Sequence, residues 1–343
     1  MKKTIINIIQ YALFIALGVL LLYLTFKGED LNKIKNILLT ANYYWIVLSL
    51  ALGYIALFVR AFRWNLLIEP LGYQPKLMNT YHALTIGYMS NYALPRIGEV
   101  VRCGTLSRIE KLPPEVLLGT VIAERAFDVL CLFVLTIFTI LLNLKKFGSF
   151  LKINVFDILG QKISTTLNFS TLVWIFLFIC VVVTISTIYI FRQRIMSIVV
   201  IKKMGSIGKG IVKGIKTVLK LKRKKTFLLF TFLMWSLYYL MTYVIFFSLP
   251  STSILKPVAG LFILVLGSYG MAAPVQGGMG AFQFMVSLGL MGLYSISKDD
   301  SIASAVLLHE SQLIGLVITG SISMVILLLR KKRILVPNDK KQV

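Results

Sequence analysis

Charged side chains inside apolar stretches are the residues of this sequence best suited to chemistry. Glu124, Arg125 and Asp128 fall within five residues of an otherwise apolar run. Glu124 and Asp128 are four residues apart, so they share one face of a helix. An ionisable residue at the middle of a membrane helix costs about 2.5–3.5 kcal/mol, so we expect this group to face protein or water. Two interpretations stay open: the wall of a polar cavity or ion-coupling site, and a self-neutralised cluster that holds helices together.

A second charged segment follows a proline. Arg96, Glu99 and Arg102 come directly after Pro95 at three-residue spacing. If the chain is helical from Ile97, Glu99 and Arg102 lie on one face. Two arginines then flank one carboxylate, which leaves a guanidinium available to hold a phosphate. A helix that begins just after Pro95 would add backbone N–H donors to such a site.

Glycine and proline interrupt a second apolar stretch in the same way. A helix is expected to end at Pro274, and the next helix is expected to begin after Gly277, Gly278 and Gly280. Paired interruptions of this kind are typical of the discontinuous helices that form substrate sites near the midplane of transporters. The alternative is that each interruption is a tight loop between two ordinary helices.

Further polar residues lie in or beside apolar runs. Arg60, Arg63 and Trp64 close an apolar run and are interpreted as an interfacial anchor. His309 stands alone, and packing or a local hydrogen bond is the expected role. Its neighbour Glu310 is a carboxylate at membrane depth and a candidate partner for one of the arginines.

The composition indicates whether these residues belong to a soluble protein or to a membrane protein. Of 343 residues, 57% are hydrophobic and only 15% charged, yet 37 Lys and Arg against 13 Asp and Glu give a net charge of +24. A nucleic-acid-binding protein would explain the charge but not the apolar excess, so no nucleic acid is expected as a partner. A polytopic membrane protein with basic cytoplasmic loops explains both. The three cysteines lack metal-site spacing, and we expect neither a metal nor a cofactor.

The apolar runs predict an all-α polytopic membrane protein. A span needs about 20 apolar residues, and two shorter, broken stretches are interpreted as re-entrant or discontinuous helices. The six full spans are predicted at Ile5–Phe26, Tyr44–Phe62, Val116–Asn143, Thr171–Phe191, Phe227–Leu249 and Ile302–Leu329, and the broken stretches at Met78–Leu94 and at the pair Pro257–Ala273 and Met279–Ile296.

Basic residues predict the orientation of these spans. The loop 192–225 holds twelve Lys and Arg and no acid, and four more follow from Arg330, so both should face the cytoplasm together with the N-terminus. The six full spans place the basic loop and both termini on the cytoplasmic side only if each broken stretch returns to the side of the membrane from which it enters. We therefore expect one integral domain over 1–343, with 1–143 and 171–330 as halves of inverted topology and a possible inverted repeat.

Four motifs in this order resemble a known family. They are Arg60-x-x-Arg63-Trp64, Asn91-x-x-Leu94-Pro95-Arg96-x-Gly98-Glu99-x-x-Arg102, Glu124-Arg125-x-x-Asp128 and Pro274-x-x-Gly277-Gly278-x-Gly280. Together they resemble the lysylphosphatidylglycerol synthase transmembrane-region family, the flippase-like domain of the bacterial multiple peptide resistance factor. The likeness extends from about Ile5 to Arg330. Because the longest hydrophilic stretch, 34 residues, is below the roughly 40 of an independent core, a stand-alone member without the synthase domain is expected.

The resemblance implies a multi-pass protein of the bacterial inner membrane that moves a phospholipid or lipid-linked molecule between leaflets. Membrane lipids are then its partners, and no catalytic residue is expected. Two alternatives stay open: a membrane-embedded transferase with Glu99, Glu124 or Asp128 as general base, and a non-transporting partner of an envelope enzyme. The residues expected to bind substrate are Asn91, Pro95, Arg96, Gly98, Glu99, Arg102, Glu124, Arg125, Asp128, Pro274, Gly277, Gly278 and Gly280.

The chain departs from the family pattern at two places. The family usually has a glutamate where Gln283 stands, and its last span often has an arginine near His309 and Glu310. Ion coupling or the charge of the substrate is therefore expected to differ in this chain.

Overall fold

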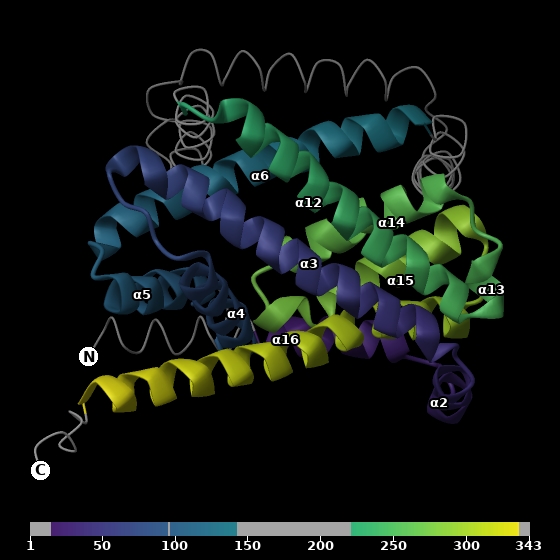
Figure 1. Cartoon of the computed structure of the whole chain (residues 1–343). Helices are drawn as coiled ribbons and strands as arrows, with labels where there is room; N and C mark the ends of the chain where they lie inside the picture. Colours follow the sequence, from purple (N-terminus) through teal and green to yellow (C-terminus); the bar gives the residue numbers. More distant parts are fainter. Residues whose placement is uncertain (1–14, 95–96, 143–220, 336–343) are drawn as a thin grey trace, which may run out of the picture.

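A computed structural model describes residues 15–94, 97–142 and 221–335, with side chains as far as Arg330, and in these ranges the protein is built from helices and short connections (Figure 1). The first described helix covers Ile15–Phe26. The others are α2 (Leu31–Leu39), α3 (Tyr43–Ile68), η1 (Glu69–Leu71), α4 (Leu77–Ala93), α5 (Gly98–Glu110), α6 (Pro114–Leu142), α12 (Lys224–Ile245), η3 (Phe246–Ser248), α13 (Pro250–Ser253), α14 (Pro257–Ala272), η4 (Gln276–Gly278), α15 (Ala281–Tyr294) and α16 (Lys298–Leu335).

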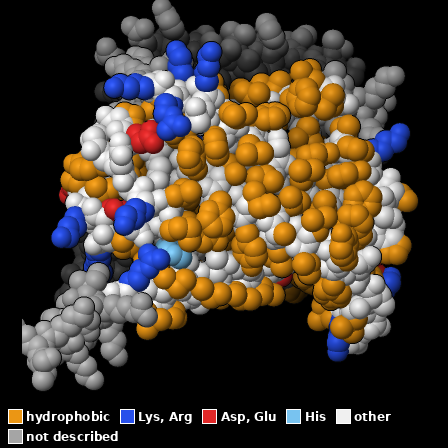
Figure 2. Space-filling view, viewed as in Figure 1, with side chains coloured by type: hydrophobic (Ala, Val, Ile, Leu, Met, Phe, Trp, Pro, Cys, Tyr) orange, Lys and Arg blue, Asp and Glu red, His pale blue; other side chains and the backbone are white. Residues whose placement is uncertain are grey.

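Within the described ranges, four helices are long and apolar enough to cross a membrane: α3, α6, α12 and α16. They carry apolar side chains on their outer faces, such as Phe232 and Val47, and hydrophobic side chains cover the middle of the face in Figure 2. Lys and Arg lie toward the edges of this face. A contiguous apolar surface of this kind is what a membrane-embedded protein presents to lipid. The protein is therefore a polytopic α-helical membrane protein, as predicted.

The four long helices coincide with four of the six predicted spans. The predicted span Ile5–Phe26 is described only from Ile15, and Thr171–Phe191 lies outside the described residues, as does the basic loop except for 221–225. The inverted relation between the two halves stays a prediction.

The first broken stretch is one arm of a helical hairpin. Helix α4 ends at Ala93, α5 begins at Gly98, and the two helices pack against each other. At the open end, the Glu110 carboxylate accepts hydrogen bonds from the Lys76 backbone N–H at 2.9 Å and from Asn79 Nδ2 at 2.7 Å. Both ends of the hairpin thus lie on the same side, which is the arrangement that a re-entrant segment requires. The re-entrant position of this segment in the membrane stays a prediction.

The second broken stretch forms the hairpin of α14 and α15. The Phe282 ring on α15 fills the space beside Gly267 of α14, and the backbone of Ala281 and Phe282 lies directly against Gly270, so the two helices approach closely. Helix α16 starts just after the open end of this hairpin and runs to the open end of the first, where Arg330 Nη1 donates to Asn79 Oδ1 at 3.1 Å. The two hairpins therefore enter from opposite ends of the long helices, and Figure 1 shows them on opposite sides of the molecule.

The tips of the two hairpins meet. Gly277, in the tip of the second hairpin, packs so closely on the Tyr92 ring of α4 that a methyl group there would overlap it. Gln276 Nε2 also donates to the Ala93 carbonyl at 3.5 Å. On its other side, the second tip packs on the first helix, where Gly280 contacts Gly18.

Helix α3 is longer than its predicted span. It begins after Asn42, whose side chain accepts from the Tyr44 N–H at 3.1 Å, and it ends at Ile68 rather than at Phe62. The predicted span ends too early because the prediction treats Arg63 as the first residue of a polar loop. In the structure Arg63 is fully buried and has charged partners, which allow it to stay inside the helix.

Candidate functional site

Two arginines of α3 face two carboxylates of α6. Arg60 Nη2 lies 2.9 Å from both Glu124 Oε1 and Asp128 Oδ2. Arg63 Nη2, one turn further along α3, lies 3.0 Å from Glu124 Oε1 and 2.7 Å from Asp128 Oδ1. One-turn spacing on both helices allows each arginine to reach both carboxylates. The four side chains therefore fasten α3 to α6 within their apolar spans.

A third arginine joins this network from the first hairpin. Arg102, on α5, places Nη2 3.0 Å from Glu124 Oε2, and its guanidinium lies over the Trp64 ring at 4.8 Å. Arg102 is 2% exposed. Its Nε and Nη1 are buried with no hydrogen-bond partner among the described residues. Arg102 therefore holds the hairpin to α6 and keeps two donors available.

The remaining pair lies at the more open edge of the network. Arg125 Nη2 is 3.1 Å from Glu99 Oε1, and both side chains are about one-third exposed. Glu99 is in the first turn of α5, next to the hairpin tip. We call the whole set the charge cluster; its members are Arg60, Arg63, Glu99, Arg102, Glu124, Arg125 and Asp128. Its four arginines against three carboxylates leave one formal positive charge.

The prediction that Arg60 and Arg63 anchor the protein at the membrane interface is wrong. Their side chains are 5% and 0% exposed and lie in the centre of the charge cluster. Helix α12 completes their surroundings, because Tyr238 and Thr231 accept hydrogen bonds from Arg60 and Arg63 at 3.1 and 3.4 Å. The signal was present in the sequence: arginines three residues apart on α3 match acids four residues apart on α6.

The first tip is closed by an asparagine and two glycines. Asn91 Oδ1 accepts a hydrogen bond from the Gly98 backbone N–H at 2.8 Å, across the turn of the hairpin. Gly98 packs directly on the backbone of Gly87, where no side chain would fit. Of the predicted site residues in this segment, Pro95 and Arg96 lie outside the described residues.

The second tip depends on glycine for its backbone. Gly277, Gly278 and Gly280 have φ values of 55°, 81° and 80°, in the left-handed region that favours glycine. Pro274 lies half-buried just before them, where α14 has already ended. The Pro and Gly interruption therefore marks a true break between two helices, as the sequence predicts.

A second polar group, here called the tip site, joins α15 and α16 to the second tip. Gln283 Oε1 accepts from the Gly280 N–H at 2.7 Å, and its Nε2 donates to Glu310 Oε1 at 2.8 Å. His309 Nε2 lies 2.8 Å from the Gly277 carbonyl oxygen. Glu310 therefore has His309 and Gln283 as neighbours, instead of the arginine partner expected from the sequence. Sequence spacing gave no signal for this contact, because 26 residues separate Gln283 from His309.

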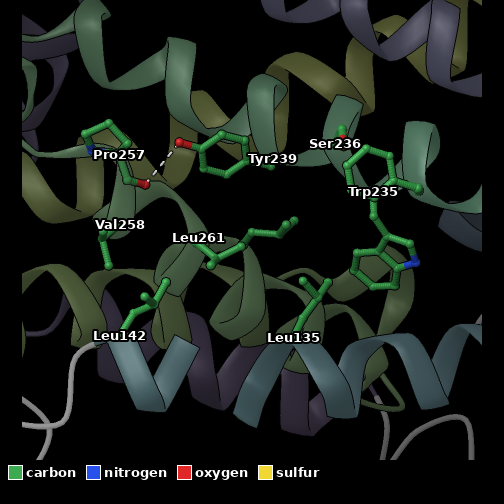
Figure 3. Close-up of a pocket in the computed structure, with 10 residues that line it drawn as sticks. Leu135, Leu142, Trp235, Ser236, Tyr239, Pro257, Val258 and Leu261 are labelled. Carbon is green, nitrogen blue, oxygen red and sulfur yellow. Dashed lines mark hydrogen bonds between the residues drawn. The ribbon is translucent and has the colours of Figure 1, made fainter. Parts of the chain in front are cut away.

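An apolar groove of about 330 Å³ lies between α6, α12 and α14 (Figure 3). Its only polar contact among the side chains drawn is the hydrogen bond from the Tyr239 hydroxyl to the Pro257 carbonyl oxygen at 3.2 Å. No member of the charge cluster lines it. The groove residues are Leu135, Leu142, Phe232, Trp235, Ser236, Tyr239, Pro257, Val258, Leu261 and Leu264.

The structure thus places most of the predicted site residues in three groups: the charge cluster and the two hairpin tips. Glu99, Arg102, Glu124, Arg125 and Asp128 form the charge cluster with the two arginines of α3. Asn91 and Gly98 shape the first tip, and Pro274 with the three glycines shapes the second. The role of these residues in binding substrate stays a prediction.

Comparison with known proteins gives one family and one relative. The sequence model of the family described as the lysylphosphatidylglycerol synthase TM region matches residues 8–320. A UPF0104 membrane protein of Methanocaldococcus jannaschii is 27% identical over 180 residues, which are 52% of this chain and 46% of the relative. The chain thus matches about half the length of this relative. No solved structure matches the chain significantly. On its sequence motifs and this match, the chain belongs to the lysylphosphatidylglycerol synthase transmembrane-region family.

Proposed function

We propose that the protein moves a phospholipid or lipid-linked molecule between the leaflets of the membrane. One observation carries the proposal: two re-entrant hairpins enter from opposite ends of the fold, and their tips meet beside a charge cluster with excess positive charge. Discontinuous helices that meet between long spans are the arrangement in which transporters bind substrate near the midplane.

The chemistry of the charge cluster suits an anionic headgroup. Arg102 has two unpaired donors, and a guanidinium binds phosphate through two parallel hydrogen bonds. Helix α5 begins at the tip with Gly98, so the positive end of its dipole favours an anion there. The apolar groove between α6, α12 and α14 would take part of an acyl chain, which gains about 0.8 kcal/mol for each buried CH₂.

The same geometry argues against Glu124 and Asp128 as the general base of the transferase alternative. A general base needs a free carboxylate oxygen within reach of the substrate. Glu124 is fully buried, and each of its two oxygens is already paired with at least one arginine. Asp128 likewise has both oxygens beside arginines. These carboxylates are better suited to hold arginines in place than to accept a proton from a substrate.

The proposal is tested with purified protein in liposomes that carry a fluorescent phospholipid in one leaflet. We expect transbilayer movement faster than in empty liposomes, and we expect Arg102→Gln to lower the rate. Arg108→Gln is the matched control, because Arg108 is exposed on the same helix and should leave the rate unchanged. If anionic, zwitterionic and lipid-linked probes all move at the rate of empty liposomes, the proposal is wrong.

We also propose that the protein lies in the bacterial inner membrane with both termini in the cytoplasm. The proposal is supported by the basic residues at the open end of the first hairpin, where Lys111, Arg223 and Arg330 lie. Cytoplasmic loops carry such an excess of Lys and Arg. A C-terminal fusion to a reporter that is active only in the cytoplasm should be active, and an inactive fusion would contradict this orientation.

A further inference from the structure

The tip site contains one contact that a neutral His309 beside an ionised Glu310 cannot explain. His309 Nε2 faces the carbonyl oxygen of Gly277, which can only accept, so Nε2 carries a hydrogen. In a neutral imidazole the other nitrogen, Nδ1, then has a lone pair and no hydrogen. Yet Nδ1 lies 3.0 Å from Glu310 Oε1, which is also an acceptor when the carboxyl group is ionised.

Gln283 cannot supply both missing hydrogens. Its amide orientation is fixed, because Oε1 accepts from the Gly280 N–H, so Nε2 is the atom that faces Glu310 and His309. The three distances among Nε2, Nδ1 and Oε1 are 2.8, 3.1 and 3.0 Å and form a nearly equilateral triangle. Two amide hydrogens point about 120° apart, whereas the two acceptors lie about 60° apart as seen from Nε2, so only one receives a good hydrogen bond.

We propose that His309 and Glu310 together bind one exchangeable proton, shared between Nδ1 and Oε1, and that this proton is the coupling ion for lipid movement. With the proton present, Oε1 accepts from Gln283 and shares the proton with Nδ1, and every polar atom of the triangle is satisfied. When the proton leaves for water, two lone pairs face each other at 3.0 Å. The second half of this proposal rests on the proposed function.

The neighbours of the pair are suitable for such a site. Glu310 has a side chain that is 35% exposed, which gives the proton a path, while His309 is 4% exposed. Tyr92 of α4 is the titratable side chain that interacts with Glu310 from the opposite hairpin. The other groups packed on the pair, Gln283, the Phe282 ring and the Gly277 carbonyl, do not titrate.

Charged groups on the remaining elements around α16 are distant along that helix. Helix α2 and the segment before it bring Lys33 and Glu29 to Asp299 and Lys298, about 15 Å along the helix from His309. Helix α3 brings Ser49, whose hydroxyl lies 3.0 Å from Gln312 Nε2, and the titratable Tyr54 hydroxyl, which lies beside Gly315.

The position of the pair connects the proton to the meeting of the two tips. His309 holds the Gly277 carbonyl, and Gln283 holds the Gly280 N–H, so two hydrogen bonds of the second tip depend on this site. Gly277 in turn packs on Tyr92 of the first tip. Loss of the proton is therefore expected to weaken the contact between the hairpins.

Histidine labelled with ¹⁵N tests the proton directly, because the chain has only two histidines. In a His82→Asn variant, reconstituted in lipid, the remaining signals belong to His309. We expect Nδ1 to change from a protonated or strongly hydrogen-bonded nitrogen to a bare one in a single step across the pH range in which the protein stays folded. Glu310→Gln should abolish this step, because the amide donates to Nδ1 and keeps the imidazole neutral.

A bare Nδ1 throughout that range, or an unchanged step in Glu310→Gln, would overturn the proton site. If the variant does not fold, the ¹⁵N titration of the His82→Asn protein alone decides, since the proposal requires a step there. The coupling is tested in liposomes: the rate of lipid movement should depend on pH in the wild-type protein and lose that dependence in Glu310→Gln. A pH-independent wild-type rate overturns the coupling alone, whereas absence of any lipid movement overturns the proposed function and leaves the ¹⁵N result standing.

Discussion

Replacing Glu124 with glutamine should destabilise the protein more than any other single change in the charge cluster. The Glu124 side chain is fully buried and contacts three arginines. Asp128 continues to serve Arg60 and Arg63, but Arg102 has no other carboxylate within ion-pair distance among the described residues. Removing one partner of a buried ion pair costs about 3–5 kcal/mol, because the other charge stays buried without compensation.

Two further variants of the charge cluster provide a comparison for the loss of stability in Glu124→Gln. Arg102→Gln removes only one of the three arginines around Glu124, so its effect on the free energy of unfolding should be smaller. Glu99→Gln breaks a pair whose side chains are about one-third exposed, and such pairs contribute about 0–1 kcal/mol. The expected order of destabilisation is therefore Glu124→Gln, then Arg102→Gln, then Glu99→Gln.

The measurement is unfolding by SDS in mixed micelles, followed by circular dichroism. The double variant Glu124→Gln/Arg102→Gln removes the uncompensated arginine along with the carboxylate, so it should be more stable than Glu124→Gln alone. The coupling energy should fall in the range of about 0.5–3 kcal/mol found for contacting residues. If Glu124→Gln is no more destabilising than Glu99→Gln, the buried network does not hold α5 to α6 as described.

Two further predictions concern glycines at the hairpins. Gly277→Ala should destabilise the protein by at least about 1 kcal/mol, because φ is positive and the methyl group overlaps the Tyr92 ring; Tyr92→Ala in the same chain should restore part of the loss in thermal stability. Gly87→Ala should separate α4 from α5 and lower thermal stability, whereas Gly104→Ala, which faces open space, should be neutral or slightly stabilising; equal melting temperatures for the two would contradict the close packing.

Much of the fold could be predicted from local sequence, because apolar runs indicate where membrane spans lie and Pro and Gly residues indicate where they are interrupted. Three of the four hairpin arms agree with the predicted stretches to within two residues; α14 begins at Pro257 as expected, and α4 covers Leu77–Ala93, whereas the arm α5 has no predicted stretch of its own. Hydropathy failed where burial depends on partners from distant segments. Helix α3 continues past Phe62 because Glu124, 61 residues ahead of Arg63, neutralises that arginine inside the protein.

The candidate site was predictable in its parts but not in its connections. Intramembrane charge alone selected Glu124 and Asp128, since such residues are too costly to face lipid. Which arginines they would meet depends on how α3, α5 and α6 pack, and single-sequence spacing does not report that packing. The tip site was harder to predict, because Gln283 and His309 look like ordinary core residues in the sequence. Their partners are backbone groups of the second tip, the Gly280 N–H and the Gly277 carbonyl oxygen, whose positions the sequence does not indicate.

Helix α16 touches both hairpins, and it does so at two different depths. It contacts the second tip through His309 and the open end of the first hairpin through Arg330. Because α16 is continuous, the 21 residues between these contacts set a rigid spacing of about 31 Å. A rod of fixed length that is attached to both hairpins opposes their sliding toward each other along its axis. Rocking about the meeting point of the tips leaves this length unchanged, so rocking is the motion that the architecture permits most readily.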